Sequence, residues 1–142
     1  TWLVPTLVAP QGVLDAVDAG APLPPAVVDK ARSLVGLHKD AIRRAVEAGV
    51  RIAMGTDSGI TPHGQNLREL GLMVECGMTP AAALEATTRS AAELLGLADD
   101  LGTIEAGKLA DLVVLEGDAY DFDGYAERVS AVWKEGSQVV GT

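Results

Sequence analysis

The sequence predicts an α/β fold that changes to β-structure near residue 100. A short apolar segment at residues 2–8 is followed by a long amphipathic pattern and then by a second apolar segment at residues 50–55. The order strand, helix, strand is typical of a right-handed parallel crossover. Beyond residue 100 the apolar periodicity changes from that of helices to that of strands. A chain of 142 residues is long enough for one domain with a hydrophobic core.

The first elements follow from apolar patterning and from the positions of proline and glycine. Trp2–Val8 is expected to be a short buried strand, although Pro5 favours an edge. Residues 9–26 carry four prolines and two glycines, so we expect a loop, in which Val13–Ala19 can form a short helical turn. A long helix is predicted where an apolar stripe runs from Ala31 to Val46, and Gly49 is suited to end it.

Three further helices are predicted before the change of periodicity. Asn66 with Glu69, and Ser90 with Glu93, have the spacing of capping boxes. Pro80 is suited to the first turn of a helix that lies between them.

Strands are predicted in the last third of the chain. Residues 103–104 and 110–115 are expected to be extended and to be separated by a turn. Residues 129–134 and 138–140 are expected to form a terminal hairpin around Glu135-Gly136-Ser137.

Charge and cysteine content limit the partners and the compartment. Eleven basic and twenty acidic side chains give a net charge of −9, which argues against a nucleic acid or an anionic membrane as partner. The single cysteine, Cys76, forbids an intrachain disulfide, so a cytoplasmic location is expected. No apolar run has the roughly 18–20 residues of a membrane span, and no signal-peptide pattern is visible. Because the chain begins within an apolar run, we expect it to be part of a larger protein.

Asp57 is the first candidate functional residue. It follows the apolar segment 50–55, and functional groups gather at the carboxyl ends of parallel strands. A carboxylate in this place can bind a divalent metal or accept a proton from water, or it can simply cap a turn. His63, in the loop that follows, can bind a metal, contact a substrate carboxylate, or remain solvated.

Other reactive side chains fit structural roles better. His38 lies on the apolar stripe of the long helix, and Cys76 is expected to be an inert buried thiol. An acidic stretch lacks the full pattern of a calcium loop, so we interpret it as a solvated loop. Its acidic residues are Glu116, Asp118, Asp121 and Asp123.

An ordered series of motifs runs along the chain. It consists of Trp2–Leu7, Met54–Gly59, Pro62–Leu67 with Glu69-Leu70, Gly77–Pro80 with Ala83, Ala86 and Thr87, Ala91-Ala92 with Leu95-Gly96, and Gly102–Val113. This series resembles the amidohydrolase superfamily, in particular its imidazolonepropionase-like and Xaa-Pro dipeptidase-like branch. Met54–Gly59 resembles the end of barrel strand eight, and Trp2–Leu7 resembles strand seven.

The resemblance implies the C-terminal part of a (β/α)8 TIM-type barrel followed by strands of a small β-sandwich. Residues 1–100 would supply barrel strands seven and eight with their helices, and residues 101–142 would supply part of the composite sandwich. In the family, the aspartate matching Asp57 binds a catalytic metal, usually one or two zinc ions, and accepts a proton from water. His63 would contact the substrate, which would be a dipeptide or a cyclic amide.

The remaining ligands of such a metal centre are absent from this sequence, which has no H-x-H motif. A full barrel also needs roughly 200 or more residues. We therefore expect the chain alone to be inactive. It would associate with the missing N-terminal part of the barrel, or with itself through exposed strand edges. The alternative hypothesis is a non-catalytic α/β module used for assembly.

Overall fold

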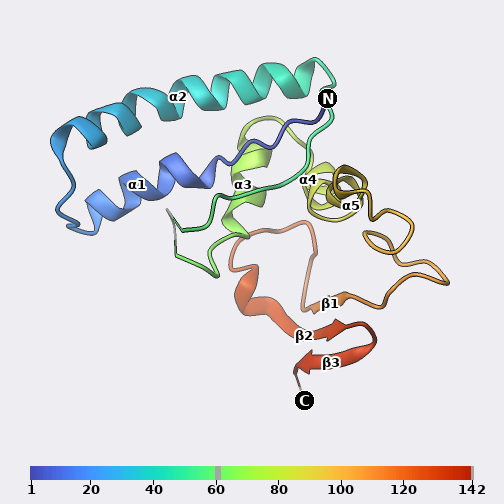
Figure 1. Ribbon diagram of the computed structural model, residues 1–142. Helices are drawn as coiled ribbons and strands as arrows, with labels where there is room; N and C mark the ends of the chain where they lie inside the picture. The colour runs from blue at the N-terminus through green and yellow to red at the C-terminus, as the bar shows by residue number, and fades with distance from the viewer. Residues whose placement is uncertain (60–61, 142) are drawn as a thin grey trace.

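The computed structural model describes residues 1–59 and 62–141, in which helices precede a small antiparallel sheet (Figure 1). The helices are α1 (Val8–Asp18), α2 (Pro25–Glu47), α3 (Arg68–Glu75), α4 (Pro80–Thr87) and α5 (Arg89–Leu95). The sheet contains β1 (Leu112–Leu115), β2 (Val129–Lys134) and β3 (Ser137–Val140), and the 3₁₀ turn η1 (Ala126–Arg128) leads into β2. The observed mixture of helices and strands confirms the α/β class.

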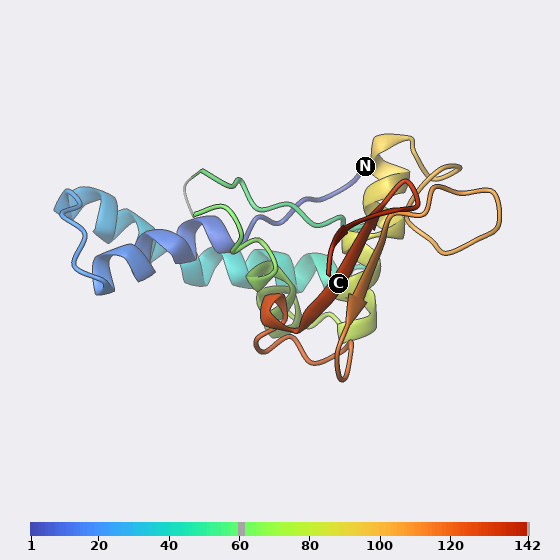
Figure 2. The same cartoon turned by 90° about the horizontal axis from the view of Figure 1, so that it is seen from below.

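The two apolar segments at the start of the helical part run side by side and parallel, as expected (Figures 1 and 2). Leu3 donates its amide to the carbonyl of Arg51 at 2.9 Å and accepts from the amide of Ala53 at 3.1 Å. Among the described residues their pairing is confined to the bridge between Leu3 and Ile52. The expected strand to Val8 is too long, because Thr6 adopts a left-handed φ of 55° and α1 begins two residues later.

Helix α1 replaces the first part of the loop that was expected over residues 9–26, and residues 19–24 remain a loop. Pro10 lies in the first turn of α1, where a missing backbone N–H costs no intrahelical hydrogen bond. The four prolines therefore do not prevent a helix here, because Pro22 and Pro24 lie in the connection after α1 and Pro25 is the first residue of α2. That long helix is confirmed, and Pro25 is its first residue.

The later helices form as predicted, but both expected capping boxes are wrong. Thr79 accepts a hydrogen bond from the amide of Ala82, which confirms the start of α4. Asn66 does not cap α3, because Glu69 turns inward to α1. Glu93 instead forms an ion pair with Arg51 at 2.9 Å.

The sheet has the order β1-β2-β3, and both pairings are antiparallel. Glu135 and Gly136 join β2 to β3 with φ angles of 50° and 79°, the left-handed pair of a two-residue hairpin turn. The expected hairpin is thus confirmed. Residues 103–104 are not a strand, because Thr103 accepts a hydrogen bond from Lys108 Nζ at 2.6 Å within a turn.

A single buried cluster connects the helical part to the C-terminal part of the chain. Ile52, Leu70 and Met73 lie in it, and Tyr125 joins it from the connection before β2. The division at residue 100 stays a prediction, and Thr142 at its end lies outside the described residues. Within the two described ranges, no helix has the length and apolar character needed to cross a bilayer.

Candidate functional site

Asp57 lies at the carboxyl end of the parallel segment that passes through Ile52. Its side chain is exposed, and its backbone is left-handed with a φ of 49°. Thr56 and Ser58 on either side join their hydroxyl oxygens at 2.8 Å. Within the described ranges no hydrogen bond or ion pair involves the carboxylate of Asp57. The described residues therefore leave the carboxylate of Asp57 accessible to a ligand.

His63 is also exposed, and it belongs to the connection between Asp57 and α3. No hydrogen bond joins it to Asp57 in the part of the chain that the structure describes. In the same part, no three histidine, cysteine or acidic side chains gather closely enough to hold a metal ion. The assignment of Asp57 to a metal and of His63 to a substrate therefore stays a prediction.

Glu69 is a buried carboxylate that the sequence analysis placed only in a helix cap. Its side chain is 0% exposed, and it is the one fully buried charged group within the described residues. Oε1 accepts from the amide of Leu7 at 2.8 Å, and Oε2 accepts from the amide of Val8 at 2.7 Å. Burial raises the pKa of the carboxyl group, and the two backbone N–H groups oppose that rise.

The amides that Glu69 binds belong to the start of α1. The first amides of a helix lack intrahelical acceptors, and the helix dipole favours negative charge beside them. Leu7 is the cap residue of α1 and Val8 is its first residue. Glu69 therefore ties α3 to the point where the chain leaves the first parallel segment.

The parallel segments approach each other closely next to this point. A Cβ atom added at Gly55 would overlap Cγ1 of Val4 on the neighbouring segment. Only glycine leaves room for that approach without a shift of the neighbour. Asp57, two residues beyond Gly55, is thereby held beside the segment that leads to Thr6.

Three other reactive groups are accounted for by structure. His38 is half-buried on α2, and Cys76 is buried with a thiol pKa raised by that burial. In the acidic stretch, Arg128 donates to the carbonyls of Glu116 and Asp118 at 3.1 and 2.8 Å. The four acidic residues of the stretch are exposed, which agrees with the interpretation of a solvated loop.

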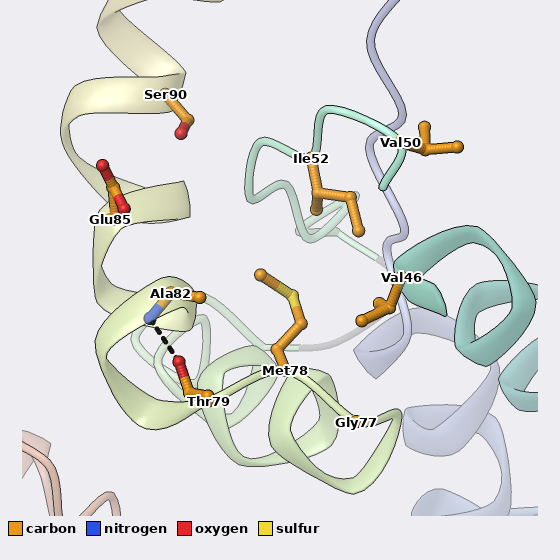
Figure 3. Close-up of a pocket in the computed structure, with 9 residues that line it drawn as sticks. All are labelled: Val46, Val50, Ile52, Gly77, Met78, Thr79, Ala82, Glu85 and Ser90. Carbon is orange, nitrogen blue, oxygen red and sulfur yellow. Dashed lines mark hydrogen bonds between the residues drawn. The ribbon is translucent and has the colours of Figure 1, made fainter. Parts of the chain in front are cut away.

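A pocket of about 340 Å³ lies between α4 and the segment that begins at Val50 (Figure 3). Val50 and Ile52 reach it from the beginning of the segment that ends at Asp57, and Met78 projects into the space between them and α4. Neither Asp57 nor His63 lines it. The lining is Val46, Val50, Ile52, Gly77, Met78, Thr79, Ala82, Glu85 and Ser90.

Sequence reasoning missed the roles of Glu69 and Gly55. Glu69 stands at a capping-box position, so its spacing suggested a local partner and concealed the one on α1. The signal available was a glutamate on the same helix face as the apolar Leu72 and Met73, which stand three and four positions later. For Gly55 the sequence offers no comparable signal, because the close neighbour is 51 positions earlier in the chain.

Comparison with known proteins finds one matching family. The model of the amidohydrolase family matches residues 6–139. An imidazolonepropionase of Shouchella clausii is 38% identical over 106 residues, which are 69% of this chain and 23% of that protein. An ochratoxinase of Aspergillus niger is 37% identical over 117 residues, which are 79% of this chain and 24% of that protein.

Solved structures show the same likeness. A Xaa-Pro dipeptidase crystallised with methionine in its active site is 39% identical, with a TM-score of 0.88. The match covers 99% of this chain and 35% of the dipeptidase. The chain thus spans about a quarter of the length of these curated relatives and about a third of the solved structure.

Proposed function

The chain belongs to the amidohydrolase family, and we propose that it forms the last part of the catalytic barrel of a metal-dependent enzyme that hydrolyses amide or cyclic C–N bonds. The observation that carries this proposal is the exposed carboxylate of Asp57 at the carboxyl end of a parallel segment. In α/β barrels the catalytic groups lie at that end of the strands.

The proposed division assigns residues 1–100 to the barrel and residues 101–142 to a small β-sandwich. The parallel pairing of Leu3 with Ile52 supports neighbouring barrel strands seven and eight. The antiparallel order β1-β2-β3 supports one layer of the sandwich. Val113, Val139 and Val140 are more than half exposed, as expected of a layer that lacks its covering strands.

Asp57 fits part of a metal centre. A carboxylate oxygen is a suitable ligand for a divalent cation such as zinc, and the described residues leave this one open. A catalytic zinc usually takes three protein ligands, so the others would come from the rest of the barrel. When bound, such a cation lowers the pKa of water toward about 7.

In this proposal Asp57 also moves the proton. Its carboxylate accepts a proton from the water that attacks the C–N bond, and it passes that proton to the leaving nitrogen. His63, exposed in the loop that follows, would contact the substrate.

A dipeptide is the proposed substrate class. The similarity to a Xaa-Pro dipeptidase over nearly the whole chain supports it. The likeness to imidazolonepropionase and ochratoxinase agrees with C–N hydrolysis in the wider family.

The experiment compares Asp57→Asn with wild type in the complete enzyme, with Asp29→Asn as the control because Asp29 is an exposed aspartate within the long helix α2. Zinc content is measured by mass spectrometry and turnover with a panel of dipeptides. Asp57→Asn should lose stoichiometric zinc and lower kcat/KM on the order of 100-fold or more, since proton transfer by a placed side chain contributes about 10²–10⁴. Unchanged zinc and turnover in that variant would refute the role of Asp57.

Two further outcomes test the rest of the proposal. The 142-residue chain alone should not hydrolyse dipeptides when zinc is added, and turnover by it would contradict the proposed division of the enzyme. A complete protein with neither stoichiometric metal nor hydrolysis would favour a non-catalytic assembly module.

A further inference from the structure

We propose that Glu69 is a positioning residue that sets the geometry of the site edge on which Asp57 and His63 lie, without contacting the substrate itself. This inference rests on the proposed function. It begins from the observation that a fully buried carboxylate has both oxygens committed to backbone amides 61 and 62 positions away in the sequence.

Two backbone amides compensate the buried charge of Glu69. Burying a carboxylate is costly unless it is hydrogen-bonded. The amides of Leu7 and Val8 supply two bonds at 2.8 and 2.7 Å, and they stand at the positive end of α1. No other side chain in the described ranges is paired with these two amides. Removal of either carboxylate oxygen therefore leaves a buried N–H group without its acceptor.

The backbone beside the amides of Leu7 and Val8 is strained at Thr6. Thr6 directly precedes Leu7 and has a φ of 55°, and Asp57 has a φ of 49°. Both stand just past the ends of the two parallel segments, and left-handed backbone is unfavourable for residues other than glycine. Such conformations persist only where the surroundings over-determine them, and they gather at functional sites. The two bonds from Glu69 hold the backbone immediately after Thr6.

Glu69 is related to Asp57 through the packing of the two parallel segments and to His63 through the chain. Val4 contacts the segment of Asp57 at Gly55, so the position of one parallel segment limits the position of the other. On the other side, Glu69 stands six residues after His63, in the first turn of the helix that ends this connection. Glu69 therefore joins the backbone that follows the first segment to the helix that follows His63.

The test uses Glu69→Gln in the complete enzyme, and Glu75→Gln is the matched control. Glu75 lies on the same helix, is exposed, and pairs with Lys39 at 2.6 Å. Glutamine keeps the shape of Glu69 but turns an amide donor toward one of the two backbone N–H groups. Should Glu69→Gln be insoluble, Glu69→Asp carries the same measurements, because it keeps two acceptor oxygens and withdraws them by one methylene.

Two measurements decide the role. Hydrogen–deuterium exchange should become faster in peptides that cover residues 4–9 and also in peptides that cover residues 53–58. In the folded enzyme kcat should fall by about tenfold or more while KM and zinc content change little, since small displacements of reacting groups cost up to about 100-fold. The control should match wild type in both.

The possible results separate this inference from the proposed function. Faster exchange confined to residues 4–9, or an unchanged kcat despite faster exchange at 53–58, would overturn the positioning role and leave a purely structural one. A wild-type enzyme without metal-dependent hydrolysis would refute the proposed function instead. In that case the exchange at residues 53–58 would still decide whether Glu69 controls the backbone of Asp57.

Discussion

Substitution of Gly102 by alanine is expected to destabilise the chain strongly, because this glycine packs against α5. An added Cβ would lie 2.7 Å from the Cβ of Ala92. It would also lie 3.0 Å from both the Cα of Arg89 and the carbonyl oxygen of Thr88. Two of these three neighbours are backbone atoms, so no side-chain rotation relieves the overlap.

The magnitude has two parts, which a second glycine separates. Gly102 and Gly107 have almost the same φ, 92° and 95°, but an added Cβ at Gly107 meets nothing within 4 Å. Gly107→Ala should therefore show the backbone cost alone, about 1–2 kcal/mol. Gly102→Ala should add the cost of overpacking, about 1–3 kcal/mol, for a total of roughly 2–5 kcal/mol.

Urea denaturation followed by circular dichroism measures both variants against wild type. The expected difference in unfolding free energy between the two variants is about 1–3 kcal/mol. It corresponds to a difference of roughly 4–12 °C in Tm, taking about 4 °C per kcal/mol for a chain of this length. An equal loss of stability in Gly102→Ala and Gly107→Ala would refute the packing explanation. A smaller loss in Gly102→Ala would show that the segment after α5 does not lie where the structure places it.

Two further predictions concern the surroundings of Asp57. Gly55→Ala should destabilise the chain by about 1–3 kcal/mol, because the added Cβ overlaps Val4. In urea denaturation, the second substitution Val4→Ala should restore most of the stability lost. A double variant as unstable as Gly55→Ala alone would contradict the contact. For Glu69, burial raises the carboxyl pKa above its ordinary value of 4.5, so the folded chain keeps a proton that the unfolded chain releases. The stability that Glu69 contributes should be complete below pH 4.5 and be lost as the pH rises through the raised pKa. Unfolding free energies of wild type and Glu69→Gln from about pH 4 to 7 test this, and parallel curves would argue against it.

Local rules located several elements and failed where a contact came from elsewhere in the chain. Helix α2 and the hairpin of β2 and β3 follow from apolar spacing and turn residues, which act over a few positions. Helix α1 was missed because the prolines and glycines of residues 9–26 outweighed its pattern, although Pro10, the one proline within α1, falls in the first turn, where a missing N–H does no harm.

The same division holds for the site. Asp57 could be nominated from the sequence, because a carboxylate after a short apolar strand is a local pattern. The sequence could not predict that Asp57 is exposed, has a left-handed backbone and lies close to the first segment. These features depend on the pairing of Leu3 with Ile52. The capping-box spacing of Glu69 even indicated the wrong partner.

The sequence by itself determined the α/β class, the long helix, the terminal hairpin and the family resemblance, because each rests on side chains a few positions apart or on an ordered series of motifs. Only the tertiary structure decided that Glu69 binds the amides of Leu7 and Val8 and that Gly55 faces Val4. A buried charge finds its partners wherever folding brings unsatisfied donors, and residues more than fifty positions apart leave no periodic trace in the sequence.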